Sequence, residues 1–346
     1  MTALIRRWAA RCGFVDRPGG RKTHSHPVAL GGGIVIFWLT MGPVALAVIS
    51  ALWLHHWGAP RWLNPALSVH IAGLAARGPA VAVLVGSAGI LHLLGLIDDR
   101  HSLGPGVKLM VQLAVATVVA TLGEIRFTFF VQSYLVTTVL SVLWIVVIIN
   151  AFNFLDNMDG LSAGIAVICA AMIFAAAMAG GQVFVGGLLA IMIGVLLGFL
   201  VFNFAPAKIF MGDAGALVVG LLIAVATIRT TYYYEQTPGG AWYATLMPVV
   251  VLAVPLYDFI SVTVLRLGRG ASPFVGDQQH FSHRLLRRGM TSRQAVLTIY
   301  LATMCTGLGA TVLHQVSQVG AVLIFVQTVL IVLIIAILER PAKANQ

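Results

Sequence analysis

Ten long apolar segments run through this 346-residue chain and restrict the folds open to it. They cover residues 29–54, 79–97, 107–122, 134–150, 160–179, 182–204, 214–234, 242–267, 293–314 and 318–338. Most are close to the roughly 20 residues that a helix needs to cross a bilayer. Backbone inside a bilayer must satisfy its own hydrogen bonds, and the connections here are brief. The sequence therefore predicts an all-α fold, a polytopic integral membrane helix bundle with about ten transmembrane helices.

The brief connections predict a single membrane domain with no soluble module. We expect a transmembrane domain at 29–338, a cytoplasmic N-terminal segment at 1–28 and a cytoplasmic tail at 339–346. The N-terminal segment carries arginines throughout and has no apolar core, which argues against a signal peptide. Its residues 3–14 are predicted to form a short helix on the membrane surface.

The net charge of +10 is distributed as expected for a membrane topology. Most Lys and Arg residues lie on the side of residue 1, while the other side holds Arg61, Arg77 and Arg126, with Arg229 close to it. Short loops rich in Lys and Arg stay cytoplasmic, so the sequence predicts a multi-pass protein of the inner (plasma) membrane. The positive charge suits membrane lipid and phosphorylated substrates. No basic stripe with interleaved aromatic residues occurs, which argues against nucleic acid as a partner.

All eight aspartates are expected on or near the cytoplasmic face. They are Asp16, Asp98, Asp99, Asp156, Asp159, Asp213, Asp258 and Asp277. Carboxylates near lipid are costly, and this chain is 59% hydrophobic and 9% charged. Acids gathered on one surface predict a cytoplasmic cleft that binds a divalent cation. Hard oxygen ligands suit Mg²⁺, with Mn²⁺ as the second choice.

Two adjacent carboxylates end the second apolar segment, in Gly95-Leu-Ile-Asp98-Asp99-Arg100. Adjacent carboxylates repel each other, so keeping both ionised near lipid requires a cation or a basic partner. A solvated Asp-Asp turn is the plainer alternative. Arg100 and Lys108 follow closely, and we expect them to hold phosphate.

A stripe of polar residues comes just before the fifth apolar segment. Asn153, Asp156 and Asp159 are spaced by three residues, which would place them roughly on one helix face. Such a stripe at the mouth of a cavity fits a site for a base, a ribose or a metal. Helix capping by Asp159 is an alternative that leaves the other two residues unexplained.

Asp213 comes immediately before the seventh apolar segment, in Phe210-Met-Gly212-Asp213. Free backbone N–H groups at a helix start bind anions, so a diphosphate could meet a metal-bearing carboxylate there. Simple capping explains Asp213 equally well.

The longest cytoplasmic loop carries a cationic cluster. Its members are Arg266, Arg269, His280, His283 and Arg284, a set suited to phosphoryl oxygens. A zinc site at the two histidines is disfavoured because cysteine partners are absent, and a merely solvated loop stays open. Asp258, an acid within a span, is expected to be functional.

A basic approach leads to the first apolar segment and ends in Gly31-Gly32-Gly33. Lys22 and His24 lie in it and suit the headgroup of a lipid phosphate. A flank that only sets the topology is an equal alternative.

Taken together, these segments resemble the polyprenyl-phosphate N-acetylhexosamine-1-phosphate transferases (glycosyltransferase family 4). The resemblance runs from about Gly13 to Gly289 and rests on RKTH, LGGG, GLIDDR, NAFNFLDNMDGL, FNFAPAKIFMGDAG, PLYD and the loop GRGASPFVGDQQHFSHRLL, in that order. It is closer to the branch that starts O-antigen, enterobacterial common antigen or teichoic-acid linkage units than to the peptidoglycan-precursor translocase. The resemblance implies transfer of an N-acetylhexosamine 1-phosphate from a UDP-sugar to undecaprenyl or a similar polyprenyl phosphate. Mg²⁺ would assist and UMP would be released, as the first membrane step of cell-envelope polysaccharide synthesis.

The resemblance also implies roles for individual residues. Catalytic residues would be Asp98, Asp99, Asp156, Asp159 and His280. Substrate would be bound by Lys22, His24, Arg100, Lys108, Asn153, Asn203, His283 and Arg284. The metal would be held by Asp213 together with Asp156. A homodimer is a further expectation.

Two features depart from the family pattern. Ser282 stands where the family's His-rich motif usually has its middle histidine, which bears on sugar specificity. The family also usually has a span before the RKTH segment, and this chain is expected to begin after it.

Two other functions fit the sequence less well. A CDP-alcohol phosphotransferase would continue from Asp159-Gly160 to an Ala-Arg pair and two more spaced aspartates, whereas this chain continues Leu-Ser-Ala-Gly. A lipid-phosphate transporter or flippase would place acids near the bilayer midplane, and only Asp258 comes close.

Overall fold

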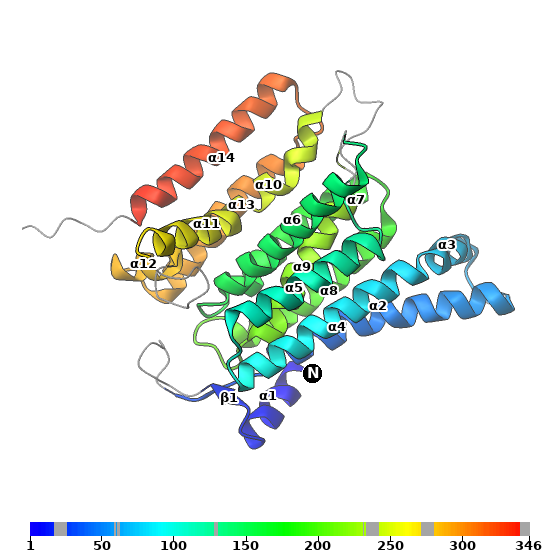
Figure 1. Cartoon of the computed structure of the whole chain (residues 1–346), viewed down its shortest axis with the longest axis horizontal. Coiled ribbons are helices and arrows are strands. Elements are labelled where there is room, and N and C mark those ends of the chain that lie inside the picture. Colours follow the sequence, from blue (N-terminus) through cyan, green and yellow to red (C-terminus); the bar gives the residue numbers. More distant parts are fainter. Residues whose placement is uncertain are drawn as a thin grey trace, which may run out of the picture.

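The computed structural model describes residues 1–16, 26–58, 60, 63–127, 131–230, 232, 242–270 and 280–339. Its helices are α1 (Thr2–Arg11), α2 (Gly32–Trp57), α3 (Pro65–Ala76), α4 (Gly78–Arg100), α5 (Pro105–Thr121), α6 (Tyr134–Leu155), α7 (Leu161–Ala179), α8 (Val183–Asn203), α9 (Asp213–Arg229), the 3₁₀ helix η1 (Trp242–Leu246), α10 (Met247–Val251), α11 (Ala253–Leu267), α12 (Phe281–Arg287), α13 (Ser292–Thr311) and α14 (Gln318–Leu338). Two short strands, β1 (Val15–Asp16) and β2 (Val28–Ala29), pair antiparallel. The long helices lie alongside one another, and α14 lies at the margin beside α13 (Figure 1).

The all-α polytopic class is confirmed, but ten spans are not. Within the described part of the chain, six helices are long and apolar enough to cross a membrane: α2, α4, α6, α7, α8 and α14. A seventh span arises if Trp242–Val251 and Ala253–Leu267, which meet at 63°, count as one. The other predicted segments are also helical, but α5 and α9 have only 17 residues each.

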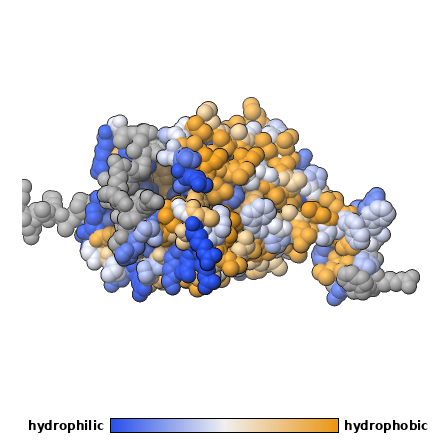
Figure 2. Space-filling view, turned by 90° about the horizontal axis from the view of Figure 1, so that it is seen from below, coloured by the Kyte–Doolittle hydropathy of each residue, from blue (hydrophilic) through white to orange (hydrophobic). Residues whose placement is uncertain are grey.

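The outer surface of the bundle is apolar over most of its length. Hydrophobic residues cover the middle of the face in Figure 2, and hydrophilic residues lie toward both ends, more densely at one of them. Only 11% of the most apolar window of α14 is buried, so this helix directs most of its aliphatic side chains outward. A bilayer provides the apolar surroundings that such a surface requires.

Helix α9 is the centre of the bundle. Every residue from Ala214 to Thr227 is buried, and the helix packs against α2, α4 and α6. A Cβ atom on Gly95 would lie 2.2 Å from the backbone nitrogen of Ala214, and one on Gly33 would lie 2.4 Å from that of Gly215. Glycine at these crossings lets the backbones touch, as at the interfaces of packed membrane helices.

The segment that leads into α9 is fixed by backbone pairing with the approach to α2. Ile209 forms a parallel bridge with Ala29, and the Phe210 N–H donates to the Ala29 carbonyl at 2.9 Å. The Gly33 N–H then donates to the Met211 carbonyl at 2.9 Å. Asp213 is therefore held by main-chain bonds on one side and by the central helix on the other.

Candidate functional site

Four helix ends meet at one end of the bundle, which we refer to as the site end. Helix α4 finishes there with Asp98 and Asp99, α5 begins near Lys108, α6 finishes just before Asp156, and α9 begins with Asp213. Residues more than 100 positions apart thereby converge, as expected from the sequence.

Lys108 joins two of the predicted carboxylates. Its Nζ lies 2.9 Å from Asp98 Oδ2 and 2.5 Å from Asp213 Oδ2. The second oxygen of Asp98 accepts the Leu103 N–H at 2.7 Å. These contacts supply the basic partner that the Asp-Asp pair requires, and they exclude a purely solvated turn at Asp98.

Asp99 reaches across to the start of the central helix. Its two carboxylate oxygens accept the backbone N–H groups of Asp213, at 2.8 Å, and Ala214, at 3.3 Å. Those N–H groups belong to the first turn of α9 and have no partner within the helix. Asp99 thus caps α9 from another helix. Its predicted catalytic role stays a prediction.

Asp213 and Asp156 lie in the most acidic part of the cluster. Asn153 Nδ2 donates to Asp213 Oδ1 at 2.8 Å, which leaves both Asp213 oxygens with one donor each. Burial raises the pKa of Asp156 well above its usual range, and the charges of Asp213 and Asp99 raise it further. One lysine therefore faces several carboxylates, and the cluster favours the arrival of additional positive charge.

The carboxylates fit a magnesium ion that is shared with a substrate. In the part of the chain that the structure describes, no three His, Cys, Asp or Glu side chains form a ready metal cage. Mg²⁺ commonly uses one or two carboxylates and completes its shell with water and substrate phosphate. Asp213 and Asp156 can supply the one or two carboxylates that such an ion needs.

Asp159 and Asn203 hold loops at the site. Asp159 Oδ2 accepts the Ala207 N–H at 2.8 Å. The Asn203 side chain is buried, accepts the Gly160 N–H at 3.1 Å and donates to the Ile209 carbonyl at 2.9 Å. This geometry favours a positioning role for Asn203, and its predicted diphosphate contact stays a prediction.

His280 is oriented by the intramembrane acid. Its Nδ1 lies 3.0 Å from Asp258 Oδ2, and the Phe281 N–H donates to Asp258 Oδ1 at 2.8 Å. Both side chains are nearly fully buried. The rings of His280 and Phe154, which lies at the end of α6, pack in a T-shaped arrangement with centroids 5.4 Å apart. Asp258 therefore connects α11 to the start of α12, and His280 in turn packs against the end of α6.

Arg284 is occupied by partners outside the cluster. Its Nη1 lies 2.8 Å from Glu339 Oε1, and its Nη2 donates to Ser261 Oγ at 2.8 Å. Tyr257 also donates to Glu339 Oε1, at 2.6 Å. This network connects α12 to the end of α14, so it gives Arg284 a structural task that sequence reasoning missed.

The other predicted substrate-binding residues lie at the edge of the site or beyond the described residues. Arg100 is exposed at the end of α4. The His283 ring lies 6.4 Å from that of His280. Lys22 and His24 fall outside the described residues, so their contact with a lipid headgroup stays a prediction.

Ser282, the departure from the family pattern, takes part in the site's framework. Its Oγ donates to Asn157 Oδ1 at 2.6 Å, and Asn157 Nδ2 donates to the Phe154 carbonyl at 2.5 Å. The small hydroxyl thus connects α12 to the acidic loop. Asn157 lies within the quoted motif, but its partner could not be identified from spacing.

A cavity of about 510 Å³ opens beside Asp159. Met158, Phe210, Thr291 and Arg293 are among its lining residues. The Arg293 Nε donates to the Ala205 carbonyl at 3.0 Å, which fixes the guanidinium at the rim. The volume lies within the range of small-molecule sites.

Comparison with known proteins finds a matching family model and several similar proteins. The model of glycosyl transferase family 4 matches residues 81–231, which include the Asp98–Asp99 pair, the acidic loop and Asp213. The chain is 32% identical to a probable undecaprenyl-phosphate N-acetylglucosaminyl 1-phosphate transferase of Bacillus subtilis, over 92% of this chain and 82% of that protein. It is 33% identical to a decaprenyl-phosphate N-acetylglucosaminephosphotransferase of Mycolicibacterium smegmatis, over 100% of this chain and 87% of the relative.

A more distant relative comes from Escherichia coli K12. This undecaprenyl-phosphate alpha-N-acetylglucosaminyl 1-phosphate transferase is 27% identical, over 86% of this chain and 76% of that protein. All three relatives are named as transferases, which gives no support to the transporter alternative.

Proposed function

This chain belongs to glycosyl transferase family 4, and from that premise we propose that it transfers an N-acetylhexosamine 1-phosphate from a UDP-sugar to a polyprenyl phosphate. The observation that carries the proposal is the junction at Lys108, where Asp98 and Asp213 meet one ammonium group. A lysine can neutralise charge on a transferring phosphoryl group, and the carboxylates beside it can hold a metal ion that does the same. The printed names of the relatives indicate the acceptor class and the N-acetylglucosamine donor class.

The proposed reaction is an in-line phosphoryl transfer. An oxygen of the polyprenyl phosphate forms a bond to the sugar-linked phosphorus of the UDP-sugar, and the bridging P–O bond breaks. The electron pair of that bond leaves with UMP. A phosphate monoester is largely ionised at neutral pH, so the acceptor needs orientation and charge neutralisation more than it needs a base.

Individual residues would share these tasks. Lys108 would neutralise charge on phosphoryl oxygens, at the cost of one of its two carboxylate contacts. His280, held by Asp258, would present its other ring nitrogen to the diphosphate or the leaving UMP. Asp99 would act by fixing the start of α9, which places Asp213.

A magnesium ion would be held by Asp213 and Asp156, and when bound it would neutralise charge on the diphosphate. The cavity beside Asp159 would take the nucleotide half of the donor. The Lys and Arg distribution supports a site on the cytoplasmic face of the plasma membrane.

The decisive experiment measures UMP release by purified protein supplied with polyprenyl phosphate and a panel of UDP-sugars. We expect UMP only when both substrates and Mg²⁺ are present, and we expect chelation to abolish it. A lipid-linked sugar diphosphate should form in equal amount. Uptake of lipid phosphate without UMP formation would contradict the proposal.

Replacing Asp258 by Asn is expected to lower kcat by about 10- to 100-fold, by analogy with the loss of carboxylates that orient metal-bound histidines. The substitution keeps the shape and one acceptor for the Phe281 N–H but removes the charge beside His280. The effect should appear in kcat with KM for the UDP-sugar little changed, and the pH profile of kcat should shift. An unchanged pH profile with only a lower unfolding temperature would indicate a purely structural role.

A further inference from the structure

The end of the bundle opposite the carboxylates contains a second large cavity. Its volume is about 500 Å³, and it lies between α3 and the start of α8, with α2 behind it. Arg229, which lines it, ends the helix that Asp213 begins, and the 17-residue length of α9 separates the two by about 24 Å. The cavity is therefore distinct from the candidate active site.

Two guanidinium groups line this cavity. Arg77 and Arg229 both contribute to it, and the same two residues line a narrower cleft of about 40 Å³ that continues inward toward Leu84 and Val225. The Arg77 guanidinium carbon lies 5.5 Å from the ring centroid of Phe184, which holds it against the wall. Of the residues that line the two cavities in the described structure, none is an aspartate or glutamate.

The charge of this cavity suits an anion. Like charges that share one pocket are unfavourable unless an anion lies between them. Glu124 acts electrostatically on Arg229 but does not line either cavity, so it offsets only part of the charge. His70, on α3, adds a further nitrogen donor to the lining. Guanidinium groups bind phosphate with paired, charge-assisted hydrogen bonds.

The remaining walls are apolar, and this favours a lipid over a soluble anion. Val44, Leu74, Val183 and Leu188 line the cavity together with the arginines. Gly78, which follows Arg77, lies against Leu52 of α2. Trp53 and Trp57, which follow Leu52 in α2, are exposed. Exposed tryptophans mark the headgroup region of a bilayer.

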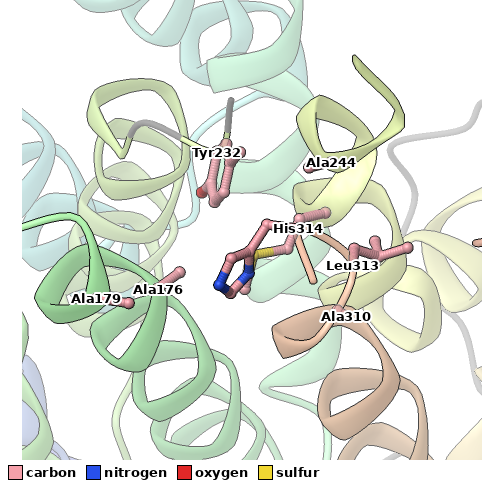
Figure 3. A pocket seen from close by; sticks show the side chains of 8 residues that line it. Ala176, Ala179, Tyr232, Ala244, Ala310, Leu313 and His314 are labelled. Atoms are coloured by element: carbon pink, nitrogen blue, oxygen red, sulfur yellow. The ribbon is translucent and has the colours of Figure 1, made fainter. Parts of the chain in front are cut away.

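A much smaller cavity, lined by different residues, differs from the one at Arg77. It lies between α7, α10 and α13 and has a volume of about 10 Å³, room for about one water molecule. Figure 3 shows the ring of His314 filling the space between Ala176 and Leu313, with Tyr232 above it. No ligand site follows from this cavity, whereas the cavity at Arg77 has both volume and charge.

We propose that the cavity lined by Arg77 and Arg229 binds an anionic phospholipid of the leaflet opposite the active site. The two arginines contact its phosphate, and the apolar walls of α2, α3 and α8 cover part of one acyl chain. A bound lipid would join the α2–α3 pair to α8 and to the end of the central helix.

Native mass spectrometry of the full chain in detergent tests this site. The probes are phosphatidylglycerol and, as the neutral comparison, phosphatidylcholine, added to wild type, Arg77→Gln, Arg229→Gln and the double variant. A basic residue near a membrane surface contributes about 1 kcal/mol, so each substitution should weaken phosphatidylglycerol binding about fivefold and the double variant about 25-fold. Phosphatidylcholine should bind weakly to all four proteins.

Arg126→Gln is the matched control. Arg126 packs over Tyr134, with its guanidinium carbon 4.1 Å from the ring centroid, and it does not line the cavity. This variant should bind phosphatidylglycerol as wild type does. Equal binding by wild type and the double variant would overturn the site. Strong phosphatidylcholine binding, or full displacement of the lipid by inorganic phosphate, would overturn the assignment to an anionic lipid.

Discussion

Replacing Asp213 by Asn should lower kcat for UMP release by about 10³-fold or more while the protein remains folded. Asp213 is the predicted metal ligand and also contacts Lys108. The substitution therefore removes the negative charge that would attract both the metal ion and the Lys108 ammonium group. Asn retains an oxygen that can accept from Asn153, which preserves much of the local packing. The measurement is kcat and KM with saturating Mg²⁺, together with the thermal unfolding midpoint in detergent.

The control for this variant is Asp16→Asn. Asp16 lies in β1, outside the cluster, and offers the same loss of one charge. It should retain nearly wild-type turnover. Full activity in Asp213→Asn would show that the junction at Lys108 is not the reaction centre. Recovery of activity at high Mg²⁺ would instead point to weakened metal affinity with the site otherwise intact.

The long helices could be predicted from hydropathy because bilayer thickness imposes a minimum length on an apolar span. The same criterion failed to fix their number. Helix α9 is short but entirely surrounded by protein, so its apolar character reflects central burial as much as contact with lipid. The segment at 242–267 proved to be two helices that meet at 63°. Pro255 has no N–H to donate to the carbonyl of Val251, where the first helix ends, so it gives a sequence signal for this break that hydropathy does not register.

The meeting of the acidic motifs could be predicted because topology places alternate loops on one side. The partner of each oxygen could not be predicted. Asp99 caps a helix that begins 114 positions later, and Asp159 accepts the N–H of Ala207. Arg284 resembled a phosphate ligand in sequence, yet Glu339 contacts it from the end of α14. Such pairs depend on packing distances that spacing along the chain does not contain.

Replacing Gly95 by Ala should disrupt both the fold of the site end and the activity. The new Cβ would lie 2.2 Å from the backbone nitrogen of Ala214 and 2.4 Å from the carbonyl carbon of Asp213. Both atoms belong to the main chain of the central helix, which has no flexible end that could move aside. Helix α4 must therefore separate from α9, at a cost of about 1–3 kcal/mol or more.

The same shift should reach the reacting groups. Asp99 follows Gly95 by four residues, so both lie on one face of α4. Gly95 provides the close approach through which Asp99 caps Asp213 at 2.8 Å. A displacement of about 1 Å at a reaction centre can cost about 10²-fold in rate. We therefore expect a lower unfolding midpoint and a fall in kcat of at least that size.

Gly86→Ala, on the same helix, separates this steric effect from a general effect of the residue change. A Cβ on Gly86 meets nothing within 4 Å, and alanine favours the helix by up to about 1 kcal/mol. This variant should be as stable as wild type or slightly more stable, with unchanged turnover. Similar behaviour of the two variants would mean that α4 and α9 do not touch at Gly95. The contact between α4 and α9 would then not be what holds Asp99 at the start of the central helix, and the positioning of Asp213 would require another explanation.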